Sequence, residues 1–422
     1  MILETIIDGI SYLTAQGPAG LFSLFWLVIL FELPRYLFSF VAAAFFTRTE
    51  NVPVADLRRV GRVGVIIAGH NEEDSVESCV RSLWEQSMPP DEIVIVSDGS
   101  TDRMKRKLAE LLHAGLIHGA HSTELRAGKS AATNLAERLA KAEILINVDC
   151  DCSFDRHAIR RIVQPFRDPK VGAVSGNIFL RNSNSTIICK FQAIEYLLSI
   201  SLGKRVLGML GQVCCASGAF GAFRHKALRD VGGLDSGGGE DLDVTLRLRQ
   251  KGWKIEFAHD AICYTDAPSN LGALVRQRMR WERDAVRLRY RKHIDVINPL
   301  SRRFQPAELF HEVEFLLFNV IGAAAMPFYV MWLVAHYGPY ALVILAGAQM
   351  GLFAMDFTTF ALAAYATPKI ASARLVPYVI GYSIFNGIVM RTIRLAAYLQ
   401  EWVFRASYSD TYVPDKVHMV RG

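Results

Sequence analysis

Apolar residues are concentrated at the two ends of the chain, whereas the middle alternates between short apolar runs and amphipathic helical patterns. Near the N-terminus, residues 20–46 are apolar except around Glu32, Pro34 and Arg35. Each half of this stretch is shorter than the ~20 residues that a spanning helix needs, so we predict one span kinked at Pro34. Glu32 and Arg35 are three residues apart and can pair on one helical face. An amphipathic hairpin lying on the membrane is the alternative.

Three further apolar stretches follow near the C-terminus, at 315–335, 340–366 and roughly 376–399, and we predict that they span the membrane. Basic residues after the first span place the region from 50 to 305 in the cytoplasm, according to the positive-inside rule. These residues are Arg48, Arg58, Arg59 and Arg62.

The C-terminal tail presents a conflict. One span before the middle region and three after it put the tail outside, but basic residues near the end of the chain favour the inside. They are Arg391, Arg394, Arg405, Lys416 and Arg421. Either the third stretch is partly interfacial or the count of spans is wrong by one.

The middle of the chain predicts an α/β domain. Runs at 63–68, 92–97 and 144–148 are typical of buried parallel strands, and helical patterns at 73–86 and 130–142 lie between or before them. Ligands of such a sheet bind at the carboxyl ends of its strands.

We therefore divide the chain into four regions. They are an N-terminal membrane segment (1–49), a cytoplasmic domain (50–305), C-terminal transmembrane helices (306–404) and a tail (405–422).

Composition adds three constraints. The chain of 422 residues is 51% hydrophobic, more than an ordinary soluble surface needs, and its formal net charge of +6 is too small and too dispersed to indicate a nucleic-acid partner. Seven cysteines match neither a disulfide framework nor a zinc ribbon, which favours a reducing compartment. The first 19 residues hold no lysine or arginine and no small-residue cleavage pattern, so we expect no cleaved signal peptide.

Polar residues follow each of the three predicted strands directly: Asn71-Glu72, Asp98-Gly99-Ser100 and Asp149-Cys150-Asp151. One aspartate after a strand is usually a turn or a helix cap, but three clusters in register indicate a shared site. Two carboxylates one residue apart can hold a divalent cation that keeps water ligands and binds diphosphate oxygens. Mg²⁺ or Mn²⁺ fits Asp149 and Asp151, whereas Zn²⁺ does not; an Asx-turn is the structural alternative.

These clusters belong to an ordered set of motifs. In chain order the set is Val65-Ile-Ile-Ala-Gly-His-Asn-Glu-Glu73, Val96-Ser-Asp-Gly-Ser-Thr-Asp102, Gly128-Lys-Ser-Ala-Ala-Thr-Asn134, Asp149-Cys-Asp151, Ser217-Gly-Ala-Phe-Gly-Ala-Phe-Arg224, Gly239-Glu-Asp241 and Gln277-Arg-Met-Arg-Trp281. It closely resembles inverting glycosyltransferase family 2, in particular the processive membrane branch that includes cellulose, chitin, hyaluronan and poly-N-acetylglucosamine synthases. The Gln-x-x-Arg-Trp pentad is the most specific of these elements. Ala68 and Ser97 depart from the family pattern, so Asp98 is left to make the contact with uridine alone.

The resemblance implies a GT-A-type nucleotide-sugar-binding domain and a role for each motif. Asp241 is the expected general base, which takes the proton of the acceptor hydroxyl. The expected donor-binding residues are Asn71, Glu72, Asp98, Lys129, Asp149 and Arg280. The expected acceptor-binding residues are Glu240, Gln277, Trp281 and Phe220.

Two amphipathic segments are expected at the membrane surface, where they seat the domain against the bilayer. The segment at 270–292 is rich in arginine and is expected to meet anionic headgroups, and the segment near 187–210 carries apolar side chains.

The leading hypothesis is a processive β-polysaccharide synthase of the plasma (inner) membrane that also exports its product, with accessory export subunits as further partners. It would use a uridine-diphosphate sugar, either glucose or N-acetylglucosamine, to extend a polysaccharide acceptor. A non-processive enzyme that glycosylates a membrane lipid is the alternative, and a transporter or sensor with an inactive transferase domain is a third class. The motifs leave the sugar and the linkage open.

Overall fold

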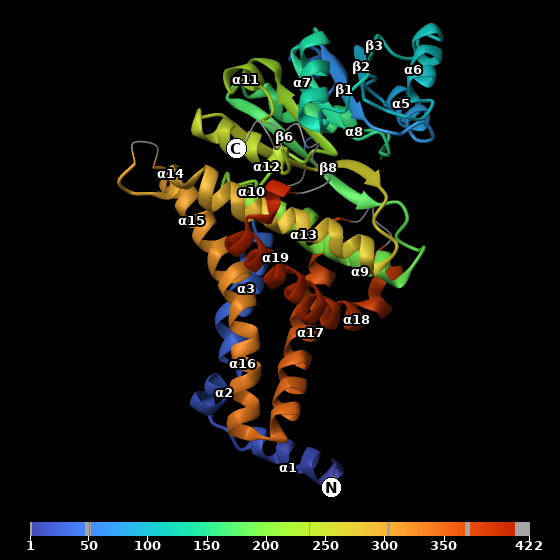
Figure 1. The fold of residues 1–422 in the computed structure, drawn as a ribbon. Coiled ribbons are helices and arrows are strands. Elements are labelled where there is room, and N and C mark those ends of the chain that lie inside the picture. The colour runs from blue at the N-terminus through green and yellow to red at the C-terminus, as the bar shows by residue number, and fades with distance from the viewer. Residues whose placement is uncertain are drawn as a thin grey trace.

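The middle of the chain folds around one eight-stranded sheet, and helices from both ends of the chain leave it on one side (Figure 1). The computed structural model describes residues 2–46, 50, 52–235, 237–301, 304–367 and 372–409. Three basic residues used to orient the chain, Arg48, Lys416 and Arg421, lie outside these ranges.

Half of the sheet is parallel, in the order β3-β2-β1-β4. Its strands are β1 (Val63–Gly69), β2 (Glu92–Asp98), β3 (Gly119–Thr123) and β4 (Ile144–Val148). The three strands predicted from the sequence are confirmed to within one residue at their ends. Their continuous apolar runs reflect burial on both faces of the sheet.

The other half is mixed, in the order β7-β6-β8-β5. These strands are β5 (Ser153–Phe154), β6 (Val171–Leu180), β7 (Phe220–Arg224) and β8 (Lys254–Thr265). The strand β7 runs antiparallel to both β4 and β6 and so joins the halves, while β6 and β8 are parallel. The fold is the expected α/β type, with a mixed rather than an entirely parallel sheet.

Helices cover both faces of the sheet. One core holds Val65 and Ile67 with α5 (Val76–Trp84), α6 (Met104–His113) and α8 (Ala158–Val163). On the other face, Ile66 packs with α7 (Lys129–Leu139). The same layer continues over β6 and β7 as α11 (His225–Asp230) and α12 (Glu240–Gln250). Short helices α4 (Val54–Arg58) and η1 (Gln164–Arg167) complete this part of the domain.

The N-terminal segment forms three helices, α1 (Ile2–Thr14), α2 (Pro18–Phe31) and α3 (Leu33–Ala43). The break between α2 and α3 falls at Glu32, two residues before Pro34. The predicted pair of Glu32 with Arg35 is wrong: Glu32 binds Arg391, and Arg35 lies 3.8 Å from Glu314. Both partners lie on C-terminal helices: Glu314 belongs to α15, and Arg391 begins α19. A bend of 110° separates residues 4–14 from α2.

Three C-terminal helical segments are long and apolar enough to cross a membrane: Pro306–Tyr337, Tyr340–Ala366 and Ser372–Phe404. The first comprises α15 (Pro306–Phe315), η4 (Leu316–Ile321) and α16 (Gly322–Tyr337), and the second is α17. The third comprises η5 (Ser372–Tyr378), α18 (Val379–Ile384), η6 (Phe385–Met390) and α19 (Arg391–Phe404), followed by η7 (Ala406–Ser409).

The third segment does not run alongside the other two. Helices α2, α16 and α17 extend together away from the sheet, whereas α19 crosses their near ends and packs along α13 (Leu271–Arg287) (Figure 1). Arg394 lies 3.4 Å from Glu282 of α13, and Tyr398 donates a hydrogen bond to the same carboxylate at 2.6 Å. The third segment is thus the one whose last helix packs along the sheet domain, and the side of the membrane on which the tail lies stays a prediction.

Arginines of the amphipathic segment at 270–292 form ion pairs with carboxylates elsewhere in the protein. The segment at 270–292 forms α13 and η3 (Leu288–Lys292), and α14 (Ile294–Ile297) follows it. Arg278 pairs with Glu195 at 2.8 Å, and Arg291 pairs with Glu401 at 2.6 Å. Arg278 and Arg291 therefore do not face lipid headgroups as expected, because carboxylates on neighbouring helices neutralise their charges. The position of the segment at the membrane surface stays a prediction.

The segment near 187–210 is also corrected. It forms α9 (Ile187–Glu195), η2 (Tyr196–Gly203) and α10 (Lys204–Met209). Tyr196, Leu197 and Leu202 are buried in the main core instead of facing lipid, and η2 packs against both β6 and α17. The segment thus connects the sheet with α17, one of the helices long and apolar enough to cross a membrane.

Candidate active site

Five residues from four elements meet at the carboxyl ends of the parallel strands. Lys129, the first residue of α7, places its ammonium nitrogen 2.6 Å from Asp149 Oδ1 and 3.6 Å from Glu240 Oε1. The backbone N–H of Gly218 donates to Asp241 Oδ2 at 3.3 Å. The positive charge of Lys129 thus lies between the carboxylates of Asp149 and Glu240.

Gly218 marks the centre of this cluster. A Cβ atom at this position would lie 3.3 Å from Lys129 Nζ, 3.5 Å from Glu240 Oε1 and 3.9 Å from Asp241 Cβ. A side chain here would therefore occupy the space between the lysine and the acidic pair. The glycine keeps that space free of a side chain of its own.

Burial raises the pKa of Glu240, and the neighbouring Asp241 adds to this effect while Lys129 opposes it. The backbone fixes the two acids, since they open α12 directly after Gly239 in the left-handed conformation (φ 69°). Asp241 Oδ1 also accepts a hydrogen bond from its own helix, at Leu242 N (2.8 Å).

Asp149 and Asp151 provide oxygen ligands at the end of β4, and the chemistry of this donor set fits Mg²⁺ or Mn²⁺. Thr265 Oγ1 donates to Asp151 Oδ2 at 3.1 Å and so orients that carboxylate. Burial raises the pKa of Asp151, and the charge of Asp149 raises it further. Among the residues that the structure describes, no group of three or more such side chains surrounds a metal position. Two carboxylates suit an ion that takes its other ligands from water and diphosphate.

Glu72 belongs to the same acidic neighbourhood. Burial raises its pKa, with further contributions from the charges of Asp151 and Asp149, while a hydrogen bond from Ser75 at 2.6 Å opposes the shift. The adjacent Asn71 has a different task. Its Oδ1 accepts from Thr101 N at 2.8 Å, which ties the end of β1 to the loop after β2.

Asp98 is buried, with 3% of its surface exposed. Its two carboxylate oxygens accept backbone hydrogen bonds from Ala127 (2.7 Å) and Gly128 (2.8 Å). The structure thus places this carboxylate under the loop that leads to Lys129, and does not present it openly to a base. Asp98 thus supports the Gly128-Lys129 turn, and its contact with the nucleotide of the donor stays a prediction.

Helix α13 carries the pentad that ends at Trp281. The guanidinium of Arg278 lies 4.3 Å from the centre of the Trp281 ring, and its ion pair with Glu195 fixes it there. Trp281 is 40% exposed, so part of the indole stays available to a sugar. Gln277 contributes a buried Oε1 that accepts no hydrogen bond within the described protein. Arg280, on the same helix, is partly buried.

Phe220 is not part of this site. Its side chain is fully buried in β7, where it packs on Phe154 with ring centroids 5.1 Å apart and covers Gly176. The expectation of direct acceptor contact is corrected, because strand alternation turns this residue into the core.

Lys204 is a residue that the sequence reasoning missed. It is buried and donates hydrogen bonds to Ser217 Oγ at 2.5 Å and Ser175 Oγ at 3.0 Å, directly behind Gly218. The sequence placed it in a surface helix, and no local pattern distinguishes a buried lysine there.

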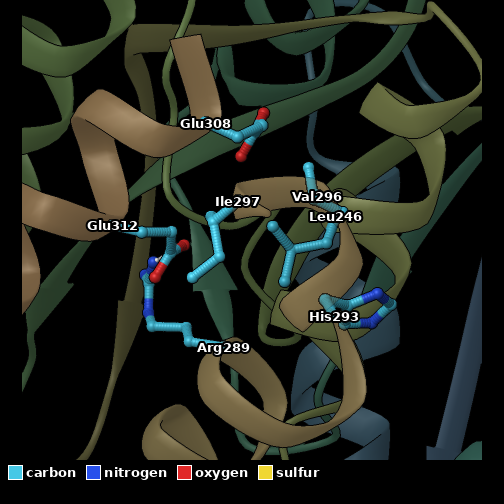
Figure 2. A pocket seen from close by; sticks show the side chains of 7 residues that line it. All are labelled: Leu246, Arg289, His293, Val296, Ile297, Glu308 and Glu312. Atoms are coloured by element: carbon cyan, nitrogen blue, oxygen red, sulfur yellow. Dashed lines mark hydrogen bonds and ion pairs between the residues drawn. The ribbon is translucent and has the colours of Figure 1, made fainter. Parts of the chain in front are cut away.

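A small cavity lies at the junction with the membrane helices, away from these residues. Figure 2 shows it between Arg289, Glu312, Glu308 and neighbouring apolar side chains. Its volume of about 10 Å³ holds one water molecule and excludes a nucleotide sugar.

Comparison with known protein families assigns this site. The model of "Glycosyltransferase like family 2" matches residues 61–283, just over half of the chain, and this range includes every expected site residue. The chain belongs to glycosyltransferase family 2. As a family 2 glycosyltransferase it has a GT-A fold, and the cluster of Lys129, Asp149, Glu240 and Asp241 lies where the strands of that fold end.

Named relatives of this family 2 glycosyltransferase synthesise a polysaccharide. The chain is 31% identical over 226 residues to poly-β-1,6-N-acetyl-D-glucosamine synthase of Staphylococcus epidermidis. The aligned region covers 53% of this chain and 54% of the relative. It is 33% identical over 218 residues to the synthase of Staphylococcus aureus (strain MSSA476). Here the aligned region covers 51% of this chain and 52% of the relative. The similarity thus spans about half the length of each relative.

A solved structure shares the fold over nearly the whole chain. The mannosyltransferase PcManGT from Pyrobaculum calidifontis, in complex with GDP-Man and Mn²⁺, superposes with a TM-score of 0.59 at 20% sequence identity. The match covers 92% of this chain and 99% of that one.

Proposed function

We propose that this family 2 glycosyltransferase is an inverting membrane enzyme that transfers N-acetylglucosamine or glucose from a uridine-diphosphate donor to a growing β-linked polysaccharide. The convergence of Lys129, Asp149, Glu240 and Asp241 around Gly218 carries the proposal. The identity of about a third to poly-β-1,6-N-acetylglucosamine synthases favours N-acetylglucosamine.

In the proposed reaction the acceptor hydroxyl attacks the anomeric carbon while the bond from that carbon to the nucleoside diphosphate breaks. Asp241 takes the proton of the hydroxyl, and Glu240 orients the acceptor. Lys129 stabilises the negative charge that develops on the departing diphosphate. Asp149 and Asp151 would hold Mg²⁺ or Mn²⁺, which supplies further charge neutralisation at the diphosphate. The observation of Mn²⁺ with a nucleotide sugar in the structural neighbour supports this assignment.

The donor and acceptor would approach from different sides. Asn71, Glu72 and the Gly128-Lys129 turn lie on the nucleotide side, and we include Arg280 there as a cation for the diphosphate. On the acceptor side, Trp281 offers a flat face for a sugar ring, and the buried Oε1 of Gln277 offers a hydrogen-bond acceptor.

We further propose three membrane crossings, formed by α2 with α3, by α16 and by α17, with the sheet domain in the cytoplasm and α19 at the inner membrane surface. This count places the tail in the cytoplasm, in agreement with the basic residues Arg391, Arg394 and Arg405. Polar side chains also occur on α17: Asp356 accepts a hydrogen bond from Tyr36 of α3, and Gln349 donates to Ser383 of α18 (Val379–Ile384) at 2.9 Å.

A donor panel tests the proposal. The purified protein in lipid nanodiscs is incubated with Mg²⁺ or Mn²⁺ and radiolabelled UDP-N-acetylglucosamine, UDP-glucose or GDP-mannose, and products are sized by gel filtration. We expect a long polymer from UDP-N-acetylglucosamine, and none from the Asp241→Asn variant. Release of a lipid that carries one sugar would establish the alternative, a non-processive enzyme. Failure of all donors in the presence of metal would contradict the transferase assignment.

A further inference from the structure

The glycine loop at 237–239, which leads into the acidic pair, rests on the last turns of α13. Arg287 Nη2 donates one hydrogen bond to the carbonyl oxygen of Gly238 at 2.7 Å and another to Asp284 Oδ1 at 2.9 Å. Asp284 and Arg287 are 6% and 4% exposed, respectively. Arg287 is thus fixed by Asp284 of its own helix and binds the glycine loop through the carbonyl oxygen of Gly238.

Only glycine fits at the contact. A Cβ atom on Gly238 would lie 2.2 Å from Asp284 Oδ2, far inside the ~3.4 Å at which ordinary van der Waals contact begins. A Cβ atom on Gly239 would lie 2.8 Å from Leu288 Cδ1. The loop is therefore in close contact with α13, which opposes a reading of the three glycines as a plain flexible linker.

The residues that follow α13 also bind α12 on the C-terminal side of Glu240 and Asp241. Asp243, one helical turn into α12, accepts hydrogen bonds from Lys292 Nζ at 2.6 Å and from His293 Nε2 at 2.8 Å. Residues on both sides of Glu240 and Asp241 are thus fixed to α13 and its extension. Because Trp281 lies one turn before Asp284, one helix carries both the proposed acceptor platform and the support of the acids.

We propose that Asp284 and Arg287 are positioning residues for the transfer reaction, which fix Gly238 so that α12 begins with Glu240 and Asp241 directed at Lys129 and Gly218. The inference rests on the proposed function, since it takes Asp241 as the general base. Asp284 holds the guanidinium, and the guanidinium holds the loop carbonyl. Loss of either partner leaves the other charge buried without its counterpart and frees the loop.

Asp284→Ala and Arg287→Gln test this role in the full-length protein. We expect kcat to fall ~10- to 10²-fold, because small displacements of reacting groups have effects of this size, while the affinity for the donor stays near wild type. Hydrogen exchange of amides in the peptide that spans 237–243 should accelerate in both variants. Arg287→Lys keeps a cation and should recover part of kcat.

Glu312→Gln is the matched control. It breaks a buried ion pair with Arg289, close in sequence to Arg287 and shown in Figure 2, that does not touch the glycine loop. We expect it to lower the unfolding temperature but to leave kcat of the folded protein and exchange at 237–243 unchanged.

A double-substitution cycle measures the contact itself. Gly238→Ala should impair transfer because the new methyl group collides with the carboxylate of Asp284. In the Asp284→Ala background the methyl group has room, so the second substitution should cost much less than it does alone. Additive losses would overturn the inference, as would Asp284→Ala with unchanged loop exchange or with a kcat loss no larger than that of Glu312→Gln. The exchange measurement does not depend on chemistry, so a failure of Asp241 as the base is recognised separately, by an active Asp241→Asn variant.

Discussion

The ammonium nitrogen of Lys129 lies 2.6 Å from Asp149 Oδ1, where the start of α7 meets the end of β4. The sequence positions of these residues are 20 apart, but adjacent parallel strands bring their loops to one edge of the sheet. The pair combines a mobile cation with a carboxylate suited to a divalent ion. Both would face the diphosphate of a donor, and this arrangement leads to the first prediction.

Removal of divalent metal should abolish transfer. Asp151→Asn should weaken metal-dependent binding of the donor, because it removes an anionic ligand and leaves the shape of the side chain. Transfer is measured against Mg²⁺ and Mn²⁺ concentration, and donor binding by calorimetry with and without metal. Undiminished activity of the wild type in excess EDTA would exclude the metal from the mechanism.

Asp98 gives a prediction about the nucleotide side. Asp98→Asn should destabilise the fold by ~1–3 kcal/mol, because an amide group replaces one of two acceptors for buried backbone N–H groups. It should also weaken donor binding, since the Gly128-Lys129 turn loses its support. Thermal unfolding and calorimetry check both effects.

Asp102→Asn provides the control for this variant. Asp102 likewise accepts two backbone hydrogen bonds, from Glu73 at 3.1 Å and Met104 at 3.0 Å, in a loop that does not lead to Lys129. Asp102→Asn should lower the free energy of unfolding about as much as Asp98→Asn does, but it should leave the affinity for the donor nearly unchanged. Equal losses of donor affinity in the two variants would show that Asp98 has no special link to Lys129.

Three of the four parallel strands, β1, β2 and β4, were predictable because each is a short apolar run bounded by polar residues. The fourth, β3, has the polar sequence Gly-Ala-His-Ser-Thr and was not predicted. The strands β6, β7 and β8 were not assigned, since their order depends on pairings between distant segments, such as Val174 with Ala222. The acidic site was predictable for a similar local reason, as its residues follow strand ends directly. The identification of Asp241 and Trp281 came instead from resemblance to a family.

Burial and pairing were the properties that the sequence did not reveal. The arginines of α13 look like a surface for lipid headgroups, but Arg278 reaches Glu195, 83 residues away in the chain. Phe220 belongs to a recognisable motif, and only the strand register shows that it faces the core. In both cases the burial of the side chain depends on residues that are distant in the sequence, and a periodic pattern cannot identify such partners.

Membrane topology gives a third prediction. In a variant without reactive native cysteines, a membrane-impermeant thiol reagent added to intact cells should label His336→Cys, at the turn between α16 and α17. It should not label Asp168→Cys in the sheet domain or Ser409→Cys after α19, because three crossings put both in the cytoplasm. All three positions are exposed or partly exposed in the structure. Labelling of Ser409→Cys together with His336→Cys, and not of Asp168→Cys, would mean that the third apolar segment does span.

Stability should depend on pH through His259, which lies in the bulge of β8 beside β6. Burial and the charge of Arg205 lower the pKa of His259 to about 4, so the folded protein keeps the neutral ring. An unfolded histidine binds a proton near its ordinary pKa of 6.5, so acidification below this value favours unfolding until about pH 4. The full effect is roughly 1–3 kcal/mol. Unfolding temperatures at pH 7 and pH 5 should differ less in His259→Gln than in wild type; equal differences would contradict the prediction.

The last prediction separates activation of the acceptor from binding of the donor at Asp241. Asp241→Asn keeps the shape of the side chain and removes the base, so donor affinity should stay near wild type while transfer falls by at least ~10²-fold. Single-turnover transfer and donor calorimetry measure the two quantities. Glu240 is the one neighbouring acid able to substitute, and burial raises its pKa, which makes it a stronger base than an exposed glutamate once ionised.

Glu240→Gln is accordingly the informative companion variant. If Asp241 is the base, Glu240→Gln alone should be milder than Asp241→Asn, because only orientation of the acceptor is lost. Combining the two should remove any residual transfer that Glu240 supports in the Asp241→Asn variant. If Asp241→Asn instead lost donor binding in step with turnover, Asp241 would be a ligand of the metal or the sugar, and the proton would have to leave the acceptor by way of Glu240.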